Sequence, residues 1–357
     1  MANDEVSQPV TLKDVAGLVG ITPAAASMAL SGNERISAKT RERVREAAAE
    51  LGYVPSSAGR ALRKQKAGAI ALIVPNTSRH VFGHSYFMHV LTGVSAAANA
   101  RDTQVLVSTS ADEANGLAAY ERVMRSKSAD GAIVTSAAVS DSNVERLADG
   151  GLPVVLIGNF PYLPHAVSVG VDDVSASKTI TEHLILVHGR TRLMHVTGPL
   201  DHQTGIDRRT GFLQAVAEHG LEERATVVEG DFSEQAGFAA VEGADFGDDG
   251  FDGIVFANDD MAFGGLESFA RRGIAVPGQV GIVGFDDFGL ARVTTPRITT
   301  IRVPAERMAQ LATEKLFDLI DGRAIAQAHH EESVTLVTRT SCGCAGETDT
   351  LLPARTP

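Results

Sequence analysis

The sequence predicts an α/β protein with a small all-α module at its N-terminus and two lobes built on doubly wound parallel sheets. Three short helical patterns with recognisable caps occupy the first 52 residues. From Ala69 onward, short apolar strands alternate with amphipathic helices, which is typical of parallel sheets covered by helices on both faces. These strands are too many for one sheet, so we expect two lobes.

Composition narrows the class of protein. A chain of 357 residues with 44% apolar residues suits two or three folding units, and its two cysteines exclude a disulfide framework. Residues 1–66 carry 10 Lys and Arg against 7 Asp and Glu, whereas the rest carry 22 against 37. A basic module on an acidic body favours nucleic-acid binding by the module alone. We expect a cytoplasmic protein, because neither a membrane span nor an apolar signal segment is evident.

The three N-terminal helices are predicted from their caps. Thr11 precedes a helix over 12–19, with Asp14 as its acidic partner. Thr22 caps a second helix that begins at Pro23, and Ser37 caps a third over 38–51. The apolar positions of the third helix should face those of the first two. The residues expected in this contact are Val44, Ala47, Ala48 and Leu51 on one side and Val15, Leu18, Met28 or Leu30 on the other.

The remaining elements follow from apolar runs and helical periodicity. Strands are predicted at 69–74, 104–108, 131–134, 153–157, 193–196, 226–229, 253–256 and 280–285. Helices are predicted at 93–100, 176–187, 208–218 and 261–272, followed by a last helix at 305–321 and a strand near 333–339. Cys342 and Cys344 lie beyond the last predicted strand, and residues 343–357 are expected to form a free, flexible tail. A redox switch between the two thiols is the less favoured alternative, because thiols one residue apart rarely form a strain-free disulfide.

The N-terminal pattern is more specific than a generic helical module. It comprises TLKDVAGLVGIT at 11–22, ASMAL at 26–30, IS at 36–37 and LGYVP at 51–55. This pattern resembles the DNA-binding headpiece of the LacI/GalR family of transcriptional regulators. The resemblance implies a helix-turn-helix, followed by a periplasmic-binding-protein-like effector domain. The alternative is a small helical bundle used for protein contacts.

A helix-turn-helix places its second helix in the major groove. Here that helix has few polar side chains, so Ser27 is the main hydrogen-bonding candidate, and Met28 stands where the family often has Arg. Phosphate contacts could also come from 41–45, although a solvated face is an equal alternative. The candidate DNA-binding residues are Thr22, Pro23, Ala24, Ser27, Met28, Ser31 and Asn33, with Ser57 and Leu62 in the connector.

The connector resembles the family's hinge helix. The resemblance implies that Leu62 wedges into the minor groove at the centre of the operator. Gly59 weakens intrinsic helicity, so we expect this segment to fold mainly on DNA. The alternative is a linker in which Leu62 packs on the body.

The resemblance continues to about residue 340 and implies a set of effector-binding residues. Arg208, Asn258 and Asp286 would supply donors and an acceptor suited to a polyol, and Phe232 an apolar face. Arg208 could equally bind a carboxylate or phosphate. Tyr86 and Phe87 match an aromatic pair after the first strand, with Phe82 as a second candidate. Asn258 and Asp286 have a structural alternative, which is to cap helices and turns.

Metal and cofactor binding are not expected. His80, His84 and His89 cluster in one predicted loop, but their spacing matches no zinc pattern and no cysteine lies near them in sequence. The prediction is therefore no metal and no cofactor.

These observations predict a homodimeric regulator that represses carbohydrate uptake or catabolism genes and responds to a sugar-like effector. The alternatives are a purine or phosphorylated-sugar corepressor, a solute-binding protein and, least favoured, an enzyme. The expected domains are a headpiece at 1–54, a hinge at 55–66, an effector and dimerisation domain at 67–342 and the tail at 343–357. The expected lobes are 67–160 with 296–325, and 161–295 with 326–342.

Overall fold

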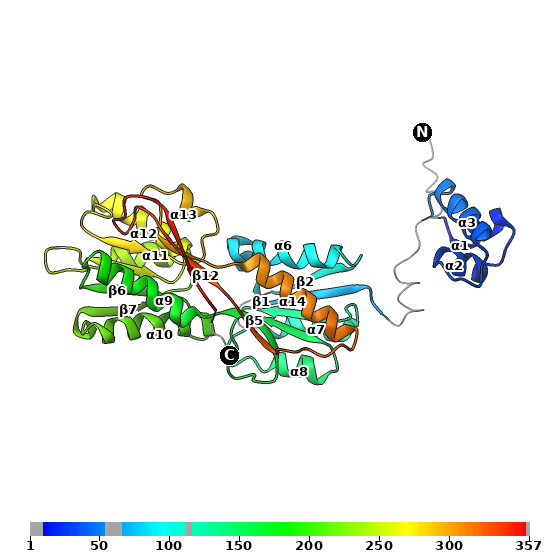
Figure 1. Ribbon diagram of the computed structural model, residues 1–357, viewed down its shortest axis with the longest axis horizontal. Helices are drawn as coiled ribbons and strands as arrows, with labels where there is room; N and C mark the ends of the chain where they lie inside the picture. Colours follow the sequence, from blue (N-terminus) through cyan, green and yellow to red (C-terminus); the bar gives the residue numbers. More distant parts are fainter. Residues whose placement is uncertain (1–9, 54–65, 112–115, 355–357) are drawn as a thin grey trace. The chain divides into compact units, whose positions relative to one another are not determined.

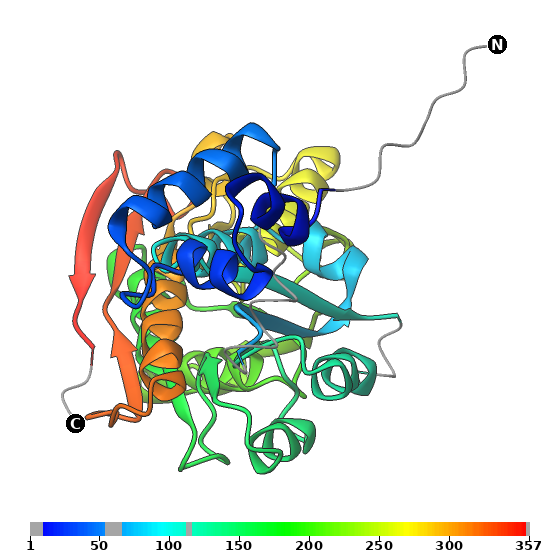
Figure 2. The ribbon, with the colours of Figure 1, turned by 90° about the vertical axis from the view of Figure 1, so that its right-hand side faces the viewer.

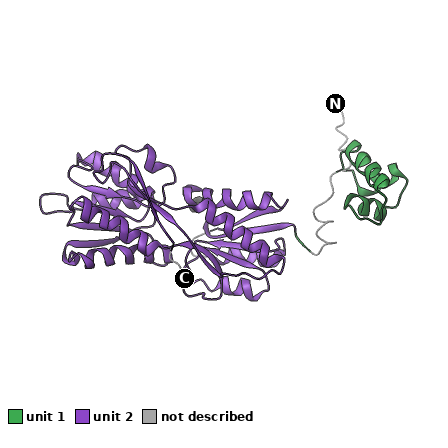
Figure 3. Ribbon diagram, in the orientation of Figure 1, with its two compact units in different colours: residues 1–67 green, residues 68–357 purple. Residues whose placement is uncertain are grey.

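The computed structural model describes residues 10–53, 66–111 and 116–354. The chain divides into two compact units, residues 1–67 and 68–357 (Figure 3). Each unit has its own hydrophobic core. No helix among the described residues is long and apolar enough to cross a membrane.

The first unit contains three helices, α1 (Leu12–Val19), α2 (Pro23–Leu30) and α3 (Ala38–Glu50). Their predicted starts are confirmed. The hydroxyl of Thr22 accepts from the Ala25 N–H at 3.2 Å, and that of Ser37 accepts from the Thr40 N–H at 3.2 Å. Each cap satisfies one backbone N–H that the first helical turn leaves without a partner.

The core of this unit is made of small aliphatic side chains. It comprises Val15, Ala16, Val19, Ala26, Ala29, Val44, Ala47 and Ala48. The expectation that Leu18 faces α3 is wrong, because Leu18 is 52% exposed. At 3.6 residues per turn, Leu18 lies roughly 100° from the face on which Val15, Ala16 and Val19 meet.

In the second unit, one lobe is built on a six-stranded sheet with the order β11-β5-β4-β3-β1-β2. Figure 1 labels β1, β2 and β5 of this sheet. All its neighbouring strands are parallel. The strands are β1 (Ala69–Thr77), β2 (Gln104–Ser110), β3 (Ala132–Thr135), β4 (Val154–Ile157), β5 (Val167–Val171) and β11 (His329–Glu332). The helices of this lobe are α5 (Ser78–Gly83), α6 (Ser85–Asn99), α7 (Leu117–Ser126), α8 (Asn143–Asp149) and α14 (Ala305–Ile320).

The other lobe is built on a four-stranded parallel sheet with the order β7-β6-β8-β9. Its strands are β6 (Leu193–Thr197), β7 (Ala225–Glu229), β8 (Gly253–Phe256) and β9 (Gly281–Val283). Its helices are α9 (Asp173–Glu182), η2 (His183–Val187), α10 (Gln203–Glu218), η3 (Glu222–Arg224), α11 (Glu234–Glu242), α12 (Asp259–Arg272) and α13 (Leu290–Val293). The predicted pair of doubly wound lobes is confirmed.

The third sheet is antiparallel and joins β10 (Thr300–Arg302), β12 (Val334–Thr338) and β13 (Thr348–Leu352) in that order. In Figure 2 its red C-terminal strands lie along one edge of this unit. Within residues 116–354 the chain passes between the two parallel sheets after β5, after β10 and after β11. Three such crossings form a hinge between the lobes.

Two expectations about boundaries are wrong. The predicted lobe limits put β5 and β11 in the second lobe, whereas both strands belong to the first sheet. The predicted flexible tail contains β13, which pairs with β12 from Val334↔Leu352 to Thr338↔Thr348. The sequence did not predict β13, because TDTLL has only two apolar residues and most of its side chains are exposed.

Candidate ligand cleft and nucleic-acid interface

A cleft lies between the two lobes of the second unit, with lining residues from both. Its empty volume is about 970 Å³, including space open to solvent at its mouth. The lining residues follow strand ends and occupy helix N-termini, where α/β folds commonly hold ligands. All six predicted effector-binding residues line this cleft: Tyr86, Phe87, Arg208, Phe232, Asn258 and Asp286.

Arg208 on α10 is held rigidly at one side of the cleft. Its Nε donates to Oδ1 of Asp173 at 2.8 Å, and its Nη2 lies 3.1 Å from Oδ1 of Asp286. The guanidinium carbon lies 3.7 Å from the centre of the Phe285 ring. Because Arg208 is only 6% exposed, these contacts fix the direction of its remaining N–H groups.

Asp286 follows β9 in an uncommon backbone conformation, with φ of 108°. Its N–H donates to the carbonyl of Ile301 at 2.7 Å, which ties it to the strand that crosses between the lobes. Burial raises the pKa of Asp286 to about 6, although Arg208 opposes this rise. At neutral pH the group is therefore an acceptor carboxylate in a poorly hydrated site.

Asn258 performs the structural role that the sequence left open. Its Oδ1 accepts from the Met261 N–H at 2.9 Å and so caps α12, and its Nδ2 donates to the carbonyl of Phe232 at 2.9 Å. An amide nitrogen has two N–H groups, so a second donor is available for a ligand. The hydrogen bond from Nδ2 also holds the backbone of Phe232 beside the start of α12.

Phe232 lies against a glycine that leaves room for its ring. Its φ is 68°, and a Cβ added at Gly198 would lie 2.0 Å from the ring. No side chain fits at position 198 unless the ring moves. Gly198 therefore lets Phe232 pack on the end of β6 while it lines the cleft.

The aromatic pair on α6 forms another wall. The hydroxyl of Tyr86 lies 3.2 Å from that of Thr135, and its ring meets Phe87 edge-on at 5.2 Å. Burial raises the pKa of Tyr86 to about 12, so the phenol stays neutral and can donate a hydrogen bond. Phe82, the second candidate, is 58% exposed and does not line the cleft.

The sequence did not identify several polar residues of the cleft, among them His84, Asn159, Asp173, Gln203 and Asp260. Nδ1 of His84, the residue before α6, lies 3.3 Å from Oδ2 of Asp260 on α12. This contact links the two lobes. Asp173 could have been found from its place two residues after β5, had that strand been predicted. Asn159 follows β4 in the same way.

The predicted DNA-binding residues of the first unit lie on α2 and the turn after it. Thr22, Pro23 and Ala24 are exposed, and Ser27 and Met28 are half-buried. Ser31 and Asn33 are exposed as well. An exposed N-terminal turn is what a recognition helix needs to reach base edges.

Several polar groups near this surface already have internal partners. Nη1 of Arg41 donates to the carbonyl of Ile36 at 2.8 Å, and Nη2 of Arg43 donates to that of Val19 at 3.2 Å. Both arginines therefore help to hold the first unit together. Ser57 and Leu62 lie outside the described residues.

Comparisons with known proteins support both units. A family model described as bacterial regulatory proteins, lacI family, matches residues 11–56, and a periplasmic binding protein-like domain matches residues 181–342. The HTH-type transcriptional regulator CelR of Thermobifida fusca is 31% identical, over 87% of this chain and 92% of its own. The HTH-type transcriptional regulator GntR of Pseudomonas aeruginosa is 29% identical, over 93% of this chain and 95% of its own.

Solved structures share the fold of this chain. A lac repressor dimer bound to operator and the anti-inducer ONPF matches with a TM-score of 0.81 and 23% identity, over 94% of this chain and 99% of its own. A complex of the regulator CelR with cellobiose matches with a TM-score of 0.69 and 25% identity, over 93% of this chain and 99% of its own.

Proposed function

This chain belongs to the lacI family of bacterial regulatory proteins, and we propose that it is a homodimeric repressor of carbohydrate uptake or catabolism genes. It binds a palindromic operator in the cytoplasm through α2 and the connector at 55–66. Two-fold symmetry of the dimer would match that of the operator. Its cleft binds a small effector without converting it.

The effector is a neutral sugar. The observation that carries this proposal is the placement of Arg208 between two carboxylates, those of Asp173 and Asp286, in a cleft that the Phe232 ring also lines. Fixed donors and acceptors suit the hydroxyl groups of a polyol, and an aromatic face suits its C–H groups. The similarity to a regulator solved with cellobiose supports the same class of ligand.

Electrostatics disfavour an anionic corepressor. Asp173, Asp260 and Asp286 all line the cleft, and Arg208 is already paired with two of them. A phosphorylated sugar would have to displace one of these carboxylates from Arg208 or leave its own charge without a full partner. A neutral ligand meets neither cost.

The effector acts by shifting the population of lobe arrangements. The chain crosses between the lobes three times, so closure on a ligand would rotate one lobe about these crossings. The first lobe begins at β1, directly after the connector. A change there would alter the spacing of the two connectors in the dimer and hence operator affinity.

A thermal-shift screen of the full chain tests this proposal. We expect stabilisation by one or more neutral mono- or disaccharides, and none by sugar phosphates or purines. Asp286→Asn should lower the affinity for the stabilising sugar by about 10-fold or more, because a charged acceptor is lost. Asp248→Asn, on the exposed surface, is the matched control and should keep full affinity.

Two results would contradict the proposal. Unchanged sugar affinity in Asp286→Asn would place the site elsewhere. Stabilisation by phosphorylated sugars or purines alone would favour the corepressor alternative. Operator binding is measured separately, by fluorescence anisotropy on DNA selected by the protein from random duplexes.

A further inference from the structure

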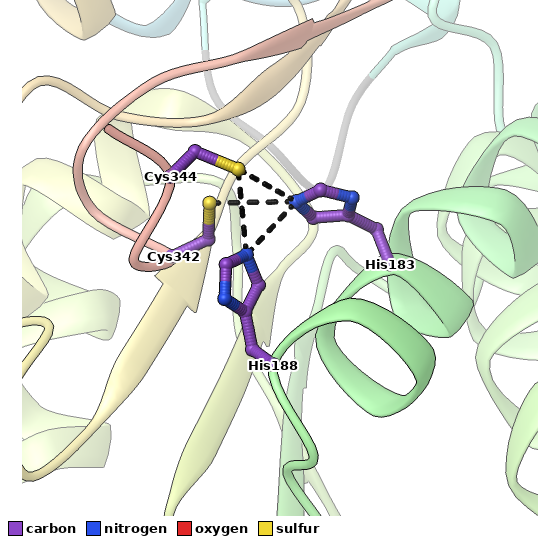
Figure 4. Close-up of side chains that lie close together, drawn as sticks. All are labelled: His183, His188, Cys342 and Cys344. Carbon is purple, nitrogen blue, oxygen red and sulfur yellow. Dashed lines mark hydrogen bonds between the residues drawn. The ribbon is translucent and has the colours of Figure 1, made fainter. Parts of the chain in front are cut away.

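Four side chains with metal-binding atoms converge at a place remote from the cleft. They are His183 and His188 at the two ends of the η2 turn, and Cys342 and Cys344 in the segment between β12 and β13. Figure 4 shows all four pointing toward one another. Their nearest ligand atoms all lie within 4.8 Å of one another. Neither cysteine forms a disulfide.

The distances match those of a tetrahedral site. The two Nε2 atoms are 3.2 Å apart, and the Sγ atoms of Cys342 and Cys344 lie 3.4 and 3.5 Å from Nε2 of His183. The Sγ of Cys344 also lies 3.5 Å from Nε2 of His188. A tetrahedron with ordinary zinc bond lengths has edges of about 3.3 Å between two nitrogens and about 3.6 Å between nitrogen and sulfur.

The local backbone brings the two histidines together. Residues five apart on an α-helix lie about 140° apart around its axis and face different sides. In η2 the chain adopts a π-helical turn, in which backbone hydrogen bonds join residues five apart. Both imidazoles therefore face the same side. Such turns are uncommon and are often found at functional sites.

Gly343 brings the two cysteines together. Its φ is 117°, and a Cβ at this position would lie 3.0 Å from Nδ1 of His188. Glycine therefore permits both the bend between the thiols and their close approach to the imidazole. The hydroxyl of Thr299 lies 3.0 Å from Sγ of Cys342, where it can orient a metal-bound thiolate.

We propose that His183, His188, Cys342 and Cys344 bind one zinc ion in a closed tetrahedral site. Two thiolates and two imidazoles suit Zn²⁺ among the common divalent cations. Four protein ligands leave no open position, so the site is structural and not catalytic. On binding, the thiols of Cys342 and Cys344 lose their protons to solvent, and the two thiolates neutralise the charge of the cation.

Zinc at this site would fasten the C-terminal segment to the second lobe. The segment already lies along β9, because the Ile282 N–H donates to the carbonyl of Ser341 at 3.0 Å. It also connects β12, which follows a crossing between the lobes, with β13. The metal therefore stabilises the end of the chain where it meets the hinge. This inference is independent of the ligand proposed for the cleft.

Metal analysis of the full-length protein tests the site. After dialysis against zinc and then against metal-free buffer, we expect about one zinc ion per chain. His188→Gln and Cys344→Ser should each weaken zinc binding by at least about 100-fold, since they remove a direct ligand. These two residues are half-buried, so their replacement should leave the circular dichroism spectrum unchanged. His219→Gln, on the same lobe but outside the cluster, is the control and should retain zinc.

A second measurement needs no variant. Co²⁺ added to the metal-free protein should give the visible absorption of a tetrahedral ion and a thiolate-to-cobalt charge-transfer band. The chain has only two cysteines. Cys342 is buried and Cys344 is half-buried. A thiol reagent should therefore modify Cys344 in the metal-free native protein and leave it unmodified when zinc is bound.

Three outcomes would overturn the proposal. The first is zinc content near zero under these conditions. The second is equal zinc content in His188→Gln, Cys344→Ser and the wild type. The third is a native mass two hydrogens lower than calculated, which would show a Cys342–Cys344 disulfide in place of a metal site, despite the strain expected of such a short loop.

Discussion

At the scale of single residues, Asp286 gives the protein a pH dependence whose sign follows from its burial. Burial raises its pKa from 3.8 to about 6, so the folded chain holds this proton more tightly than the unfolded chain. The resulting stabilisation is complete below about pH 4 and is lost as the pH rises to about 6. Asp286→Asn removes this component. Its free energy of unfolding, relative to wild type, should rise by about 1–3 kcal/mol between about pH 4 and pH 7.

Denaturant titrations of the ligand-free chain at both pH values measure this difference. Asp248→Asn is the exposed control and should show little change with pH. A constant difference between Asp286→Asn and wild type across the range would contradict the assignment of the raised pKa to Asp286.

Gly198 is a second position where one atom matters. Gly198→Ala places a Cβ where the Phe232 ring now lies, so the ring must move out of its place in the cleft wall. We expect a loss of about 1–3 kcal/mol in the free energy of unfolding, together with weaker binding of the cleft ligand. Gly243→Ala is the matched control, because its Cβ would meet only ordinary contacts. Equal stability of Gly198→Ala and the control would show that the ring does not depend on this glycine.

At the scale of elements, we expect the connector to contribute more to operator affinity than α2 of the headpiece. The N-terminal turn of α2 is exposed but presents Pro23 and Ala24, which offer no side-chain hydrogen bonds. Affinity should therefore depend strongly on the connector. Leu62→Ala is expected to weaken operator binding by about 10-fold or more, because an apolar wedge is lost. Leu18→Ala, at an exposed leucine of α1, should leave it unchanged.

Fluorescence anisotropy on the selected operator gives both affinities, and thermal shift with the cleft ligand checks that the second unit is intact. Operator affinity unchanged by Leu62→Ala would favour the alternative in which this segment is only a linker.

The elements also show which features the sequence could predict. Caps and 3.6-residue periodicity located α1, α2 and α3 within a residue or two, because these signals are local. β5 and β13 were missed because VSVGV and TDTLL lack a long apolar run, and their place depends on partners far along the chain. Asp173 was missed for the same reason, since it is recognisable only by its place two residues after β5, at the start of α9.

At the scale of the whole molecule, the resemblance identified residues that one cleft brings together from both lobes, whereas the cysteine–histidine cluster had no such guide. His183 and His188 lie more than 150 residues before Cys342 and Cys344. The two histidines are five residues apart, a spacing that places them on different faces of an α-helix and on one face only in the π-helical turn. Composition and spacing cannot report a contact that depends on an irregular turn and on the return of the C-terminal segment to β9.

Polar contacts between the lobes carry the last prediction. Nδ2 of Asn159, after β4, donates to Oδ2 of Asp207 on α10 at 3.0 Å, which joins the first lobe to the second. Asp207 does not itself line the cleft, but its Oδ1 also accepts from Nε2 of Gln203 at 2.7 Å, and both Asn159 and Gln203 line it. Its loss should therefore weaken ligand binding in two ways, by freeing these two side chains and by making the closed arrangement less populated. A hydrogen bond to a charged group contributes about 1.5–3 kcal/mol, so Asp207→Ala should lower ligand affinity by at least several-fold.

Thr210→Ala is the control, because the Thr210 hydroxyl donates to the carbonyl of Ile206 within α10 itself. Isothermal titration with the cleft ligand measures both variants. Small-angle scattering of the ligand-free proteins should show a larger radius of gyration for Asp207→Ala than for Thr210→Ala, since the lobes separate more often. Equal affinity and equal radius in the two variants would mean that this contact does not bias closure.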